Sequence, residues 1–179
     1  MSDNLKMRIF NSQKKLWYWG KLSDAGAIKM VPKTITSEQI LSLHESSPIQ
    51  VVSAPGPGKV LVPRDIVASI KVIGDPYSYA DLDGTPRASV SAPSLSWGSE
   101  TLSQFESGVF QDLLTATEDS LTYLSPFRDF ESYPYTLDGE YGIENTPIVL
   151  SMFQEDVKLI GGLGDLRFSL FYSVVEVDS

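Results

Sequence analysis

The clearest strand pattern in the sequence is Leu166-Arg167-Phe168-Ser169-Leu170-Phe171-Tyr172-Ser173-Val174-Val175. Successive side chains of a strand lie on opposite faces. One face is therefore expected to hold Leu166, Phe168, Leu170, Tyr172 and Val174, and the other Arg167, Ser169 and Ser173. This period of two is typical of a strand with one buried face.

Turn signals and further apolar segments lie on the N-terminal side of this stretch. Gly161-Gly162-Leu163-Gly164-Asp165 predicts a tight turn just before it. The segments 49–53 and 59–62 flank Ala54-Pro55-Gly56-Pro57-Gly58, a pattern that predicts a hairpin. Further strands are expected over 66–72, 88–97, 121–124 and 147–153, with Pro63 and Pro93 as interruptions and residues 75–87 as a loop.

Helices are expected to be few and short. Thr36 and Gln39 have the spacing of a capping box, which predicts a helix over about 37–44. A second short helix is expected within 104–115. The sequence therefore predicts a mainly β fold: a single domain resembling a β-sandwich or jelly roll, with one or two short helices and an extended N-terminal arm.

The N-terminal segment differs from the rest in charge. Residues 1–33 contain seven basic and two acidic side chains, a balance of +5, whereas the remaining residues contain seven basic and 21 acidic ones, a balance of −14. Alternation over 5–10 and a run of apolar residues over 16–20 predict two strands there. We expect an extended basic arm over 1–35, attached to a β-sandwich body over 36–179.

Aromatic residues are concentrated in the arm and in the segment 125–145, which is predicted to be a long ordered loop. Aromatic side chains are enriched at the centres of protein interfaces. A loop of this length in a compact domain is usually a contact surface. The residues predicted to bind a partner are Leu5, Met7, Arg8, Ile9, Lys14, Lys15, Trp17, Trp19, Tyr133 and Tyr135.

Known catalytic and ligand-binding patterns are absent from the sequence. There is no cysteine, and the single histidine, His44, is expected to be a packing or surface residue. Gly58-Lys59 lacks both the first glycine and the following hydroxyl of a phosphate loop. Asp81-Leu82-Asp83-Gly84 lacks the remaining ligands of a calcium loop. We therefore predict no catalytic, cofactor-binding or metal-binding residues and no enzyme activity.

Composition also bears on the expected partners. An acidic body would repel nucleic-acid phosphates, so nucleic acid is not an expected partner. No apolar run approaches the roughly 20 residues of a membrane helix, and the N-terminus lacks the apolar core of a signal peptide. We expect neither membrane association nor secretion.

Several pieces of the sequence between residues 36 and 175 resemble a group of small proteins encoded among the virion and head genes of tailed phages and prophages. These pieces are Leu43-His44-x-Ser46-x-Pro48, the segment 49–63, Pro76-Tyr77, Asn145-Thr146-Pro147-Ile148, the turn 161–165 and Phe171-Tyr172-Ser173-Val174-Val175. The arm lies outside the resemblance and the 125–145 loop is longer than expected, so both could be attachment devices.

The resemblance implies a non-enzymatic component of the phage virion, assembled in the host cytoplasm, of the capsid decoration or cement type. Its expected partners are the major capsid protein or other virion proteins, and copies of itself, with a trimer favoured. The alternative that we retain is a carbohydrate-binding or tail-fibre-associated β-sandwich module that uses aromatic residues of the 125–145 loop.

Overall fold

The computed structural model of the chain describes residues 6–11, 16–21, 27–45, 48–87, 93–97, 107–124, 135–136, 144–152 and 156–176. In chain order its elements are β1 (Lys6–Asn11), β2 (Leu16–Lys21), β3 (Lys29–Ile35), α1 (Ser37–Ser42), β4 (Ile49–Val52), β5 (Lys59–Ile70), β6 (Tyr77–Asp81), β7 (Pro86–Arg87), β8 (Pro93–Trp97), α2 (Ser107–Leu114), β9 (Ser120–Leu124), β10 (Tyr135–Thr136), β11 (Ile148–Met152), β12 (Val157–Gly161) and β13 (Leu166–Glu176). The fold is mainly β, as predicted, with two short helices.

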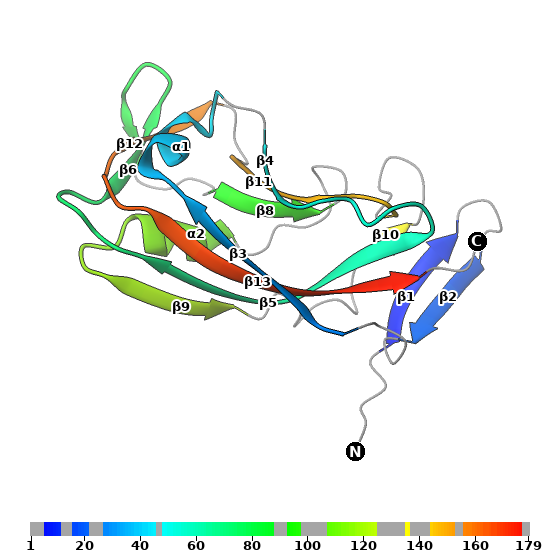
Figure 1. Cartoon of the computed structure of the whole chain (residues 1–179). Helices are drawn as coiled ribbons and strands as arrows, with labels where there is room; N and C mark the ends of the chain where they lie inside the picture. Colours follow the sequence, from blue (N-terminus) through cyan, green and yellow to red (C-terminus); the bar gives the residue numbers. More distant parts are fainter. Residues whose placement is uncertain are drawn as a thin grey trace.

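A four-stranded antiparallel sheet in the order β3-β13-β5-β9 forms the base of the fold. β13, the stretch with the clearest alternation, pairs with β5 along its whole length and with β3 over seven residues. The two longest strands of the protein therefore lie side by side at the centre of this sheet (Figure 1).

Smaller sheets lie over one face of this base. They have the orders β4-β11-β8 and β12-β6-β7, and a third sheet joins β10, β1 and β2. Figure 1 shows α1 beside the β6 and β12 end, with α2 between β8 and β9. β8 begins at Pro93 and lies at the edge of its sheet, where a residue without an N–H group is tolerated.

One hydrophobic core joins the central sheet, the β4-β11-β8 and β12-β6 strands and both helices. Leu166, Phe168 and Leu170 of β13 enter it from the base sheet and are at most 3% exposed. The ring of Phe110 from α2 packs edge-on against Phe168, with ring centroids 6.0 Å apart. The buried face of β13 that the alternation predicts is thus confirmed up to Leu170.

The predicted helix start is also confirmed. Thr36 accepts a hydrogen bond from the backbone N–H of Gln39, and the Gln39 side chain accepts one from the backbone N–H of Thr36. Asp165, at the end of the glycine turn, accepts a further hydrogen bond from the N–H of Ser37. The turn before β13 therefore also anchors the start of α1.

The predicted hairpin over 49–62 is wrong. β4 pairs with β11, and β5 pairs with β13, so the turn between them connects two different sheets. Six residues, two of them proline and two glycine, separate the strands, which is enough chain to change layers. The turn signal predicted a reversal correctly, but the partner strands are chosen by burial against the core.

The segment 75–87 is a strand pair and not the predicted loop. β6 pairs with both β12 and β7, and Tyr77 and Tyr79 of β6 are buried. Asp, Gly and Pro residues on either side concealed the short alternating pattern. β12 was not anticipated either.

Two boundaries also differ from the predictions. Residues 29–35, assigned to the arm, form β3 and pair with β13, so they belong to the central sheet. The interruption predicted at Pro63 does not divide the strand, because β5 continues through it to Ile70. Instead the register shifts: Pro63 pairs with Tyr172 and Asp65 with Phe171, which leaves Arg64 as the extra residue of a β-bulge.

We expect Gly162→Ala to lower the free energy of unfolding by about 3 kcal/mol. Gly162 has a φ of +67°, and an added Cβ would lie 2.5 Å from the ring of Tyr77. Gly74→Ala is the matched control, because its φ is +73° and nothing lies within 4 Å of the added Cβ. The free energy of unfolding of the control should fall by only about 1 kcal/mol, because the substitution introduces backbone strain alone. Equal losses in urea titrations of both variants would contradict the packing role of Gly162.

Candidate contact surface

The structure brings together two groups of predicted partner-binding residues. β1 pairs antiparallel with β2, so that Arg8 is opposite Trp19 in the backbone register. β10 pairs parallel with β1 and places Tyr135 beside Ile9. Met7 and Trp17 also lie on these strands. A strand of the 125–145 segment thus joins the arm in one sheet, and Leu5, Lys14, Lys15 and Tyr133 lie outside the described residues.

The base sheet has an open face, which we call the outer face. By strand register it consists of Met30, Pro32 and Thr34 of β3; Arg167, Ser169 and Phe171 of β13; Asp65, Val67 and Ser69 of β5; and Leu121 and Tyr123 of β9. None of these residues is buried, although β13 and β5 are the central strands. No layer formed by the described part of the chain therefore covers this side of the sheet.

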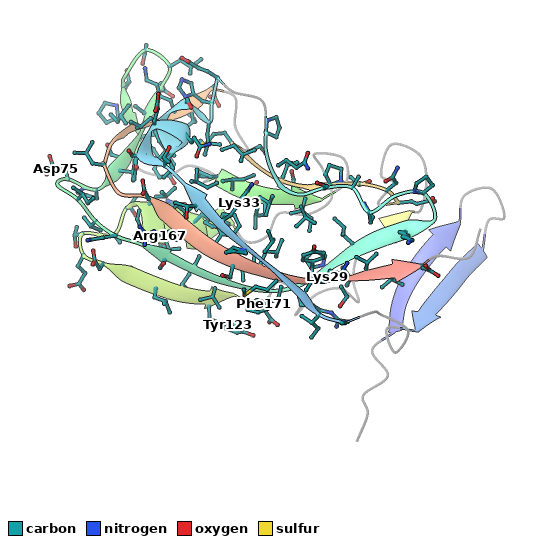
Figure 2. The ribbon with its side chains drawn as sticks, in the orientation of Figure 1. Lys29, Lys33, Asp75, Tyr123, Arg167 and Phe171 are labelled. Atoms are coloured by element: carbon teal, nitrogen blue, oxygen red, sulfur yellow. The ribbon has the colours of Figure 1, made fainter. Side chains whose placement is uncertain are left out.

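Apolar and aromatic side chains are prominent on the outer face. Leu121 is 73% exposed, Tyr123 61% and Met30 56%, and Phe171 of β13, which is opposite Met30, is half-buried. Figure 2 shows Tyr123 and Phe171 near each other along the lower side of the sheet. Contiguous exposed apolar surface on a protein commonly marks an interaction site. The sequence alone did not reveal this surface, because 121–124 could not be assigned a buried face.

Charged groups on the outer face lie toward opposite ends of it. The hydroxyl of Tyr123 donates a 2.6 Å hydrogen bond to Asp65, and this bond raises the pKa of the Tyr123 phenol. Arg167 is exposed four residues before Phe171 on β13, whereas Asp65 is opposite Phe171 on β5. The hydrogen bond holds the Tyr123 ring over its own sheet and fixes part of the surface.

The bulge in β5 limits the outer face. Beyond it Ser173, Val175, Val60 and Val62 are buried, although they lie on the same side of the sheet as Arg167 and Phe171. Ser173 therefore lies on the predicted face of β13, with Arg167 and Ser169, but it is buried there.

A groove lies beyond the bulge, on the face of the base sheet opposite to the outer face. It has a volume of about 420 Å³, and the apolar residues in its lining include Val31, Val51, Leu61 and Val174. Lys29 and Lys59 also line it, and the Lys59 ammonium lies 3.7 Å from the carboxylate of Glu176. Figure 2 labels Lys29 near this end of β3. Among the described residues, the lining contains no acid, histidine or paired nucleophile and base.

The glycine–proline turn before β5 binds a carboxylate of its own chain. The N–H of Gly58 donates to Glu144 at 2.6 Å, and the N–H of Gly56 donates to the Asn145 side chain at 2.8 Å. The backbone N–H of Asn145 donates in turn to the carbonyl of Lys59. The two glycine amides that could have met a phosphate thus have internal acceptors.

The other candidate sites also have structural roles. Arg87 forms ion pairs with Asp81 and Asp156, and the backbone N–H of Thr85 donates to Asp83 and lowers the pKa of that carboxyl. His44 contacts the Leu41 carbonyl through Nδ1 at 3.1 Å at the end of α1. Across the described ranges there is no group of three or more His, Asp or Glu residues placed to hold a metal ion.

Two buried tyrosines of β6 differ in hydrogen bonding. Tyr77 donates a 2.6 Å hydrogen bond to the Gly164 carbonyl. The hydroxyl of Tyr79 has no hydrogen-bond partner among the described residues. Burial, reinforced by the charge of Asp165, raises the pKa of Tyr77 from 10.0 to about 12. Burial also raises the pKa of Tyr79, with a further contribution from Asp112.

Comparisons with known proteins give no relative for this arrangement. No protein-family model, curated protein or solved structure matches the chain. Within the part of the chain that the structure describes, neither helix has the length and apolar character needed to cross a bilayer.

We expect Tyr77→Phe to lower the free energy of unfolding by about 1–3 kcal/mol, because it leaves the buried Gly164 carbonyl without its donor. Tyr79→Phe should be neutral or slightly stabilising, because it removes a buried hydroxyl that has no partner in the described structure. Urea titrations at pH 7 measure both effects. A larger loss for Tyr79→Phe than for Tyr77→Phe would contradict these assignments.

The same tyrosines should make the fold sensitive to alkali. Because the folded-state pKa of Tyr77 is raised to about 12, its stabilising contribution is complete below pH 10 and is lost as the pH rises from 10 toward 12. We expect stability to fall over this window, and less steeply in Tyr77→Phe. Thermal melts from pH 8 to 11.5 test this, and identical slopes for the two proteins would contradict it.

Proposed function

We propose that the chain is a non-enzymatic structural protein of a tailed-phage particle, of the capsid decoration or cement type. Its partners would be the major capsid protein or other virion proteins, and further copies of the chain. The proposal rests on the resemblance described above and on one structural observation in particular. That observation is the open outer face, where apolar residues are exposed on both edge strands (Met30, Leu121 and Tyr123) and half-buried on the two central strands (Val67 and Phe171).

Two kinds of observation support a structural role over catalysis or ligand binding. The residues that suggested phosphate or calcium binding have partners within the chain, and the groove is lined by both apolar residues and lysines. A cement protein needs extended surfaces that exclude water, and it needs charges that select an orientation. The basic arm, in one sheet with β10, would supply a second surface of opposite charge to the acidic body.

Deletion of residues 1–26 should remove the chain from the particle while its body stays folded. The deletion must end before β3, because residues 29–35 pair with β13. We expect particle occupancy to fall at least tenfold, which corresponds to about 1.4 kcal/mol of binding free energy. Occupancy would be measured by mass spectrometry of purified particles that are produced from the genome encoding the chain. Circular dichroism would report folding.

Charge reversal of two lysines in the arm complements this deletion, and charge reversal of one lysine in the body is its control. Lys14→Glu with Lys15→Glu should weaken attachment, and more so at low salt, where charge attraction acts over a longer range. Lys71→Glu reverses an exposed charge on the body and should leave occupancy unchanged. Full occupancy after deletion of residues 1–26 would refute attachment through the arm.

A carbohydrate-binding module remains the second candidate, and one described pair favours it. The exposed ring of Tyr123 beside the Asp65 carboxylate combines an aromatic surface with a hydrogen-bond acceptor, as sugar recognition requires. If this function holds, a glycan array should give a sugar-specific signal. Tyr123→Ala should abolish that signal, whereas the control Tyr172→Phe, a substitution in the groove, should leave it unchanged. A blank array would leave the structural role as the function.

A further inference from the structure

The two edges of the base sheet differ in how well they are protected against pairing with another strand. β3 carries Pro32 at its centre and Lys29 and Lys33 on either side. Proline removes a backbone donor, and charged residues disfavour addition of a strand. β9 has the sequence Ser-Leu-Thr-Tyr-Leu, with neither proline nor charge, and no strand among the described residues pairs with its free side.

Exposed apolar side chains accompany the unprotected edge. Leu121 and Tyr123 are the two outer-face residues of β9, and they are among the most exposed large hydrophobic residues of the described chain. Native proteins usually cover, shorten or charge an edge of this kind. The combination of free backbone groups and exposed apolar side chains fits another β-strand and not a small ligand.

We propose that β9 pairs antiparallel with β9 of a second copy of the chain, through a twofold axis perpendicular to the sheet. The two base sheets then form one continuous sheet of eight strands, in the order β3-β13-β5-β9 followed by the same strands in reverse. The dimer forms in solution and does not require the proposed role in a particle.

Symmetry and strand geometry fix the register. Residues directly opposite each other in an antiparallel pair lie on the same face, so outer-face residues must oppose outer-face residues. The twofold axis then lies midway between one residue of β9 and the same residue of the partner strand. Only an axis at Thr122 pairs all five residues, with Ser120 opposite Leu124 of the partner subunit. It also places Leu121 opposite Tyr123 in both copies.

The pairs in this register are chemically compatible, and this favours a second copy as the occupant. Leu121 and Tyr123 form two aliphatic–aromatic cross-strand pairs, which stabilise sheets by about 0.2–1 kcal/mol each. Glu118 and Asp119 precede the strand, so no acidic residue opposes another, and Asp119 already accepts a hydrogen bond from the N–H of Val72. The same five residues therefore complement themselves without a like-charge contact.

The absence of cysteine allows a direct test by single-cysteine cross-linking. Opposed residues of an antiparallel pair have Cα atoms about 4.5–5.5 Å apart, within the range that a disulfide spans. Thr122→Cys should form a cross-linked dimer under mild oxidation, at least tenfold faster than Thr34→Cys on the other edge. Thr34 is the more exposed of the two threonines, so random collision would favour the control.

Two further measurements make the outcome decisive. A mixture of Leu121→Cys and Tyr123→Cys chains should give mixed disulfide dimers in excess of either homodimer. Light scattering of the unmodified chain at about 100 µM, an affinity range of weak dimers, should give twice the monomer mass of 19.7 kDa, and Leu121→Asp should give the monomer. Equal cross-linking of Thr122→Cys and Thr34→Cys, a monomer, or a trimer unaffected by Leu121→Asp would overturn the proposal.

Discussion

The backbone ladder between β13 and β5 is the constraint on which the rest of the structure depends. It runs the full length of β13 and holds the longest strands of the chain in a fixed register on each side of the bulge at Arg64. Because side chains alternate along both strands, that register decides which residues enter the core and which form the outer face. The turn immediately before β13 is tied to α1 and to β6, because Asp165 accepts a hydrogen bond from the N–H of Ser37 and Gly164 accepts one from Tyr77.

Sequence patterns predicted the parts of the fold that have a single buried side and a local signal. The alternation of β13, the capping box at Thr36 and the glycine turn at 161–165 are of this kind. The pairing of β4 could not be predicted in the same way, because strand partners depend on burial between distant segments. β6 was missed because its two tyrosines lie between residues typical of loops.

The candidate surface was less predictable than the fold. Tyr135 and Ile9 were both named from the sequence, but only the structure places their strands side by side. Leu121, Tyr123 and Phe171 were not singled out, since an exposed apolar residue and a buried one look alike in a sequence. Residues that resembled ligand sites proved to have internal partners, such as Glu144 on the amide of Gly58. Acceptors drawn from distant segments carry no sequence signal.

The extra residue Arg64 in β5 has a consequence for how this protein can vary. On one side of it Ile66 faces the core and Val67 faces outward, whereas on the other side Leu61 lines the groove and Val60 and Val62 are buried on the opposite face. Removing or adding one residue here would exchange the two faces over half of the strand. Chain length at this position is therefore under tighter constraint than residue identity, and related sequences should differ there by substitution and not by insertion or deletion.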